Sequence, residues 1–169
     1  MGRFMNHKKW VVVLALIATA LILTHLPVSE ADAAVSASDF LIEGSTLTKY
    51  RGTDERVTIP DTVEVVGESA FENNQKVQLV VVPKSVKRMD AYVFWGCDNL
   101  EEVVLGKGLT SVDEYAFSGC TGLKQITIPE NVQSIDAQAF AGCTNLTDIY
   151  IPDTVTSIAD DAFLNCHTV

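Results

Sequence analysis

A strict 23-residue period, running from Val57 to the C-terminus, constrains the fold of this chain more than any other feature of its sequence. The period needs no insertion or deletion, and it places an aromatic residue and a cysteine in register. The recurring residues are Phe71, Phe94, Phe117, Phe140 and Phe163, with Cys97, Cys120, Cys143 and Cys166. A unit this short cannot bury its own apolar edge, so successive units must stack into a solenoid.

The period divides the chain into three parts. We predict a leader over residues 1–33, an opening or capping coil over residues 34–56, and a repeat region over residues 57–169. Five repeats fill that region: 57–79, 80–102, 103–125, 126–148 and the slightly short 149–169. At about 4.8 Å per coil, such an array is roughly 25–30 Å long.

Each repeat reads as a strand, a bend and a return. Around Ile126 and Ile128 the alternation has period two, so these side chains face the interior and Thr127 faces outward. Pro129 lacks a backbone donor and ends the strand. Asp136 then stands where it could cap a short helical turn, and Asp90 and Asp113 occupy the same column.

The full pattern, Ile-Pro-x-x-Val-x-x-Ile followed by Ala-Phe-x-x-Cys-x-x-Leu, closely resembles the BspA-like leucine-rich repeats of bacterial surface proteins. Asn74 replaces the first cysteine of the pattern and Gly106 replaces one proline. The resemblance implies an α/β repeat solenoid: a right-handed stack of 23-residue coils, with a parallel sheet on one face and short helical turns on the other. It also implies an extracellular recognition or adhesion module of bacterial type, without enzymatic activity in its repeats.

The leader has the three-part pattern of a secretory signal peptide. Arg3, Lys8 and Lys9 precede an apolar run over residues 10–23, and a small-x-small site ends at Ala33. A retained membrane anchor is the alternative, but this run of fourteen residues covers only about 21 Å of a ~30 Å hydrocarbon core. We therefore predict cleavage after Ala33 and a secreted or cell-surface product without a membrane span.

Charge and histidine content argue against several functions. The net charge of −10 opposes nucleic acid as the main partner, because phosphate binding needs a basic surface. Without the leader, His167 is the sole histidine, so a histidine-activated nucleophile is not expected. Gly106-Lys107-Gly108 lacks the spacing of a phosphate loop and reads as a turn in place of proline. We predict no catalytic, metal-binding or cofactor-binding residue and no cofactor.

The four cysteines allow two interpretations. An exported protein commonly forms disulfides. Equivalent residues of stacked coils, however, lie about 4.8 Å apart with parallel Cβ vectors, whereas a disulfide needs converging Cβ atoms about 3.8 Å apart. A ladder of buried, unreactive thiols is therefore favoured, although the sequence leaves their redox state open.

Outward strand positions form the predicted binding surface, since solenoids of this kind bind through the extended face of their strands. The alternative is that β-branched residues occupy these positions because strands favour them. Trp95 is a further candidate, as a binding hot spot or as a cover over the neighbouring coil. The candidate partner-binding residues are Leu79, Val81, Val104, Thr127, Tyr150 and Trp95.

These features predict a non-catalytic module that binds a protein or glycan at the cell surface. The alternative function is a structural spacer within a larger adhesin, of which this chain is a truncated part. No polar cap follows the last repeat, which ends at Val169. Truncation explains that end, and self-association through the uncapped coil is the other explanation.

Overall fold

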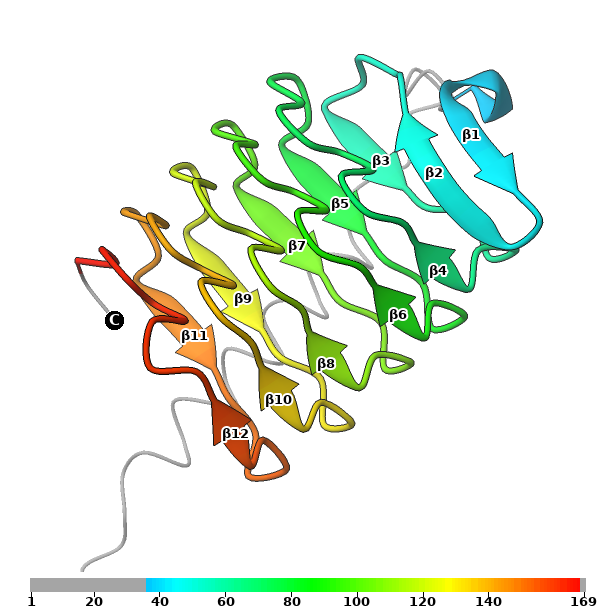
Figure 1. The fold of residues 1–169 in the computed structure, drawn as a ribbon. Coiled ribbons are helices and arrows are strands. Elements are labelled where there is room, and N and C mark those ends of the chain that lie inside the picture. The colour runs from blue at the N-terminus through cyan, green and yellow to red at the C-terminus, as the bar shows by residue number, and fades with distance from the viewer. Residues whose placement is uncertain (1–35, 168–169) are drawn as a thin grey trace, which may run out of the picture. The chain divides into compact units, whose positions relative to one another are not determined.

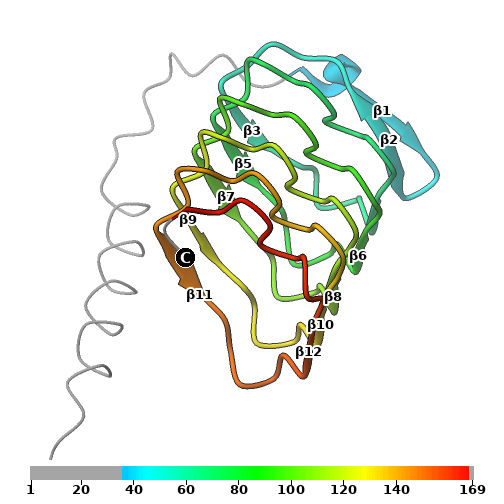
Figure 2. The same cartoon turned by 60° about the vertical axis from the view of Figure 1, so that its left-hand side comes forward.

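The computed structural model describes residues 36–167, which form a solenoid of stacked coils (Figure 1). The predicted signal peptide and its cleavage site lie outside these residues. Within residues 36–167 no helix has the length and apolar character needed to cross a bilayer. Figure 2 shows the coils one behind another, with two rows of strands on different sides of the stack.

The first strand row is a parallel sheet to which every repeat contributes one strand. Its order is β11-β9-β7-β5-β3, and the register advances by one repeat from strand to strand, as in Val57 opposite Val80 and Ile126 opposite Ile149. We call this surface the strand face. Its members are β3 (Arg56–Thr58), β5 (Leu79–Val81), β7 (Glu102–Val104), β9 (Gln125–Thr127) and β11 (Asp148–Tyr150).

The second strand row consists of two-residue strands that pair in parallel, except that β6 and β8 are not paired with each other. β4 pairs with β6 in one sheet, and β8, β10 and β12 form another. The prediction of a parallel sheet on a single face was therefore incomplete. The members of this second row are β4 (Val65–Val66), β6 (Arg88–Met89), β8 (Ser111–Val112), β10 (Ser134–Ile135) and β12 (Ser157–Ile158).

A β-hairpin covers the first coil. β1 (Phe40–Glu43) pairs antiparallel with β2 (Thr46–Tyr50), and β2 continues in parallel onto β4. A single 3₁₀ turn, η1 (Ala37–Asp39), precedes the hairpin. The hairpin thus supplies a partner for strand groups that the first repeat would otherwise leave open.

The prediction of short helical turns is wrong, because residues 36–167 contain no α-helix. The turn segment of each of the first four repeats instead holds two left-handed residues four positions apart, such as Tyr92 at φ 60° and Gly96 at φ 67°. Alternate amides bond to the next coil: Tyr92 N–H donates to Glu114 C=O at 3.2 Å and Phe94 N–H to Ala116 C=O at 2.9 Å. Other amides of the segment close four-residue turns, as Trp95 N–H does by donating to Tyr92 C=O at 3.1 Å, so the bonds of an α-helix cannot propagate.

The aspartate column does not cap helices either. Asp90 Oδ1 lies 2.6 Å from Arg88 Nε, and Asp113 Oδ1 accepts a hydrogen bond from Ser111 Oγ at 2.5 Å. Each aspartate directly follows its strand, and its carboxylate bonds to the side chain of the strand residue two positions back. The cap prediction failed because the segment that follows is not helical.

Stacked aromatic rings run through the core from end to end. Phe71, Phe94, Phe117, Phe140 and Phe163 lie with successive ring centroids 5.0–5.3 Å apart. The column continues through Tyr50 to Phe40 in the hairpin, again at 5.1 Å. Each such pair contributes about 0.5–1.5 kcal/mol beyond its burial.

The predicted ladder of buried thiols is confirmed for three of its four members, and the fourth, Cys166, is only partly buried. Cys97, Cys120, Cys143 and Cys166 are free, and the first three are fully buried. Each Sγ–H donates at 3.1 Å to the carbonyl of a phenylalanine one coil back, as Cys120 does to Phe94. The first coil has no phenylalanine carbonyl before it; there Asn74 Oδ1 accepts from the backbone amides of Lys76 and Val77 instead.

Candidate recognition surfaces

The strand face collects five of the six predicted binding residues on one sheet. Leu79 and Val81 belong to β5, Val104 to β7, Thr127 to β9 and Tyr150 to β11. Their outward direction follows from strand geometry, because the central residue of each strand points into the core. Val80, Val103 and Ile126 are buried accordingly.

Polarity varies along this face. The outward residues of the middle strands are all half-buried; Leu79, Val81 and Val104 are apolar and Glu102 is charged. Arg56 and Gln125 on the flanking strands are exposed. A bridge of 2.8 Å between Lys124 Nζ and Glu101 Oε2, just before β9 and β7, borders the sheet. An apolar centre with a charged border is the arrangement found in protein interfaces.

Tyr150 lies at the far end of the face and is already hydrogen-bonded. Its hydroxyl donates to Glu130 Oε1 at 3.0 Å. That bond is the main reason why the pKa of Tyr150 is raised, with desolvation and the charges of Glu130 and Asp153 adding to it. The bond fixes the ring, so the ring rather than the hydroxyl is left for contact with a partner.

Trp95 does not belong to the strand face. It lies in the turn segment between β6 and β7, and its side chain is 40% exposed. Its column varies in burial, because Ser118 and Ala141 are buried whereas Leu164 is exposed. The structure therefore separates Trp95 from the other five candidates.

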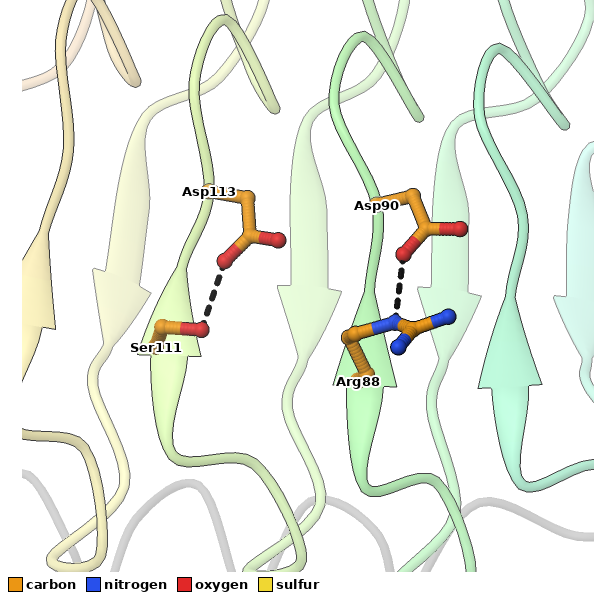
Figure 3. Close-up of polar contacts among 4 residues, drawn as sticks. All are labelled: Arg88, Asp90, Ser111 and Asp113. Carbon is orange, nitrogen blue, oxygen red and sulfur yellow. Dashed lines mark hydrogen bonds and ion pairs between the residues drawn. The ribbon is translucent and has the colours of Figure 1, made fainter.

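The second strand row carries a polar stripe that the sequence had suggested only as helix caps. Figure 3 shows Arg88 with Asp90 on one strand, and Ser111 with Asp113 on the next repeat's strand. Partial burial raises the pKa of Asp113, the hydrogen bond from Ser111 lowers it, and the charges of Asp136 and Asp90 raise it further. Within residues 36–167 no three acidic, histidine or cysteine side chains cluster as a metal ion would require.

Two tyrosines stack at the edge of this stripe. The rings of Tyr92 and Tyr115 are nearly parallel, with centroids 4.8 Å apart and planes 6° from each other. Desolvation, then the charges of Tyr115, Glu114 and Glu68, raise the pKa of Tyr92. Their 23-residue separation was a signal that column analysis could have used.

Comparison with known proteins agrees with this architecture. The family model of the BspA type leucine rich repeat region matches residues 49–169 in 6 copies. A leucine rich cell surface protein of Faecalibacterium prausnitzii is 35% identical, with a TM-score of 0.70, over 72% of this chain and 32% of that one. A leucine rich repeat protein of T. pallidum is 28% identical, with a TM-score of 0.75, over 78% and 66%.

A leucine-rich repeat protein of Bacteroides capillosus is also 28% identical, with a TM-score of 0.57, over 66% of this chain and 97% of that one. The chain thus spans about a third of the Faecalibacterium protein, 66% of the T. pallidum protein and almost all of the Bacteroides one. A search of curated proteins finds no match.

Proposed function

We propose, since the chain belongs to the BspA-type leucine-rich-repeat family, that it is a non-catalytic recognition module that binds a protein or glycan partner outside the cell. The kinship to a bacterial cell surface protein supports an extracellular or cell-surface location. The leader pattern of residues 1–33 supports export independently.

The observation that carries this proposal is the composition of the strand face. A continuous five-stranded parallel sheet presents an outward ladder with Leu79, Val81 and Val104 at its centre. Half-buried apolar side chains surrounded by polar ones can exclude water from a contact, which is how binding energy concentrates at the centre of an interface. Tyr150 adds an aromatic ring at the end of the ladder.

A spacer function is the second candidate, and the same residues support it. Val81 and Val104 are β-branched, and strands favour such side chains whether or not a partner covers them. In that case the chain holds other parts of a surface protein at a distance and has no ligand of its own.

Charge insertion on the strand face distinguishes the two functions. The purified chain, coupled to fluorescent beads, is tested against a glycan array and an array of secreted proteins and receptor ectodomains. The variant Val81→Lys with Val104→Lys puts two charges in the apolar centre. The matched control, Ser134→Lys with Ser157→Lys, adds the same charges to the second strand row.

We expect at least a tenfold loss of binding to any array hit in the strand-face variant and little change in the control. Thermal melts of the parent chain and both variants test whether the fold persists. If the strand-face variant keeps every hit of the parent chain, the strand face is not the binding surface. A parent chain that gives no hit at all would favour the spacer function.

A further inference from the structure

A cavity lies at the corner where the coils leave the strand face and turn toward the second row, and its lining comes from the first three repeats. This cavity has a volume of about 520 Å³ and opens to solvent. Its lining contains three lysines, all from the repeats of β5 and β7, and one aspartate from the repeat of β3. The lining residues are Asp61, Lys84, Ser85, Lys87, Lys107 and Gly108.

The positive charge of this corner is unusual for the molecule. Twelve Lys and Arg residues occur in a chain of net charge −10, and three of them precede residue 36, so nine lie in residues 36–167. Three of those nine line this one cavity, against a single carboxylate, that of Asp61. In residues 36–167 the ion pairs are Arg88–Asp90 and Lys124–Glu101, so neither uses a cavity lysine.

A buried hydroxyl lines the same cavity without a partner. Among residues 36–167, Ser85 Oγ is the one buried side-chain oxygen or nitrogen that makes no hydrogen bond. Leaving such a group unsatisfied is unfavourable, so native structures rarely do it without a reason. A turn of the Ser85 side chain toward the opening would let an acceptor atom bound in the cavity supply the missing bond.

Two glycines bring the walls of the cavity together. A Cβ at Gly108 would collide with the carbonyl oxygens of Val86 and Lys84, and one at Gly106 would collide with the carbonyl of Pro83. The departure from proline at Gly106 therefore allows the third repeat's bend to lie against the second's. This close approach sets Lys107 beside Lys84 in the same column.

The same corner is not cationic farther along the stack. A second cavity of about 530 Å³ is lined by Thr110, Glu130, Asn131, Gln133, Thr154 and Thr156. Glu130 and Asn131 occupy the columns of Lys107 and Gly108, and Asn131 Nδ2 donates to Lys107 C=O at 2.6 Å. The cationic character thus belongs to two coils and is not a general property of the repeat.

We propose that the cavity of Lys84, Ser85, Lys87 and Lys107 binds a tetrahedral oxyanion, the phosphate or sulfate group of a ligand. Several ammonium groups and one hydroxyl suit a group with acceptor oxygens in three directions. A planar carboxylate is matched instead by the fork of an arginine, and no arginine lines the cavity. This site is separate from the strand face and does not depend on its function.

Amide chemical shifts of the full, ¹⁵N-labelled chain test the site at constant ionic strength, with chloride as the reference anion. The probes are inorganic phosphate, inorganic sulfate, a monosaccharide phosphate and a sulfated disaccharide. We expect saturable shifts at Ser85, Gly106 and Gly108 with millimolar or tighter affinity. Tighter binding of an ester than of the free ion assigns the group to a larger ligand; equal binding assigns the site to the ion itself.

Two variants and a charge-matched control decide the outcome. Lys84→Gln with Lys107→Gln should weaken binding at least tenfold, and Ser85→Ala about threefold, with the fold intact. The control, Arg51→Gln with Lys76→Gln, removes the same charge from exposed positions elsewhere and should bind like the parent. Shifts that chloride reproduces, or an equal loss in the control, would overturn the proposal, because either would mean general attraction of anions.

Discussion

The two ends of the solenoid use the same kind of residues and bury them very differently. At the first coil the ring of Tyr50 stacks between Phe40 and Phe71 and is only 3% exposed. At the other end of the same ring stack, Phe163 in the last coil is only partly buried, although its ring stacks on Phe140. The difference comes from the hairpin that covers the first coil, because nothing in residues 36–167 covers the last.

The same contrast holds within single columns of the repeat. Ile135 is 1% exposed and its equivalent in the last coil, Ile158, is 45% exposed. Leu164 of that coil is 48% exposed. A coil's core is therefore completed by its neighbours, as expected for an array in which stability comes from contacts between adjacent repeats. Self-association through the last coil stays a prediction, which a monodisperse monomer at high concentration would contradict.

Removing a ring from the aromatic column should give the largest difference in stability between the middle and the end of the stack. Phe117→Ala removes a fully buried ring with a phenylalanine on both sides, and we expect a loss of about 3–5 kcal/mol in the free energy of unfolding. Phe163→Ala, at the partly exposed end, should cost less than half as much. Urea denaturation of both variants measures the difference, and equal losses would show that the end coil is packed like the middle.

The buried thiols should make the stability of the fold fall at alkaline pH, and the buried and the partly exposed thiol should differ in this effect. Burial raises the pKa of Cys143 from 9.0 to about 12, so the folded state keeps this thiol protonated where the unfolded chain ionises. Stability from this group is complete below pH 9 and is lost as pH rises toward 12, by about 1.4 kcal/mol per pH unit. Replacing Cys143 with alanine should remove the contribution of this thiol to the pH dependence of the free energy of unfolding, measured by urea titrations at pH 9–11.

Cys166 provides the matched end-coil variant. Its pKa is also raised by desolvation, but its side chain is only partly buried. Cys166→Ala should therefore change the alkaline slope less than Cys143→Ala does. In the native chain a thiol reagent should also label Cys166 first. Labelling of Cys143 at the rate of Cys166 would contradict the difference in burial.

Much of the fold follows from the period alone. The period predicted a strand in each repeat, inward side chains at Ile126 and Ile128, and phenylalanine packed on phenylalanine, and the structure confirms all three. The turn segments could not be derived in the same way. Their amides bond to the next coil, and residues such as Tyr92 and Gln138 adopt left-handed backbone that their side chains do not favour. Tertiary contacts override local preference there.

The surface features likewise divide into those that the sequence predicts and those that depend on tertiary packing. The columns of Val81 and Val104 were readable from sequence because strand alternation decides which side chains point outward. The bond from Tyr150 to Glu130 joins a strand to a bend one coil back, which alternation does not describe. Lys84 and Lys107 share a column and could have been found, whereas the unsatisfied Ser85 hydroxyl depends on packing that only the structure shows.

The smallest expected effect comes from single hydroxyl groups at the two ends. Tyr50 donates to Asp54 Oδ2 at 2.9 Å from a buried ring, and burial raises the pKa of that phenol well above its ordinary value. Tyr50→Phe keeps the ring and loses the bond, so we expect a loss of about 0.5–1.5 kcal/mol. Tyr150→Phe removes a bond of similar length on an exposed surface and should change stability by less than about 0.5 kcal/mol.

Thermal melts of the two variants compare them directly. An equal loss would mean that the last coil holds its surface bonds as tightly as the hairpin does, and burial by a neighbour would no longer explain the difference between the ends.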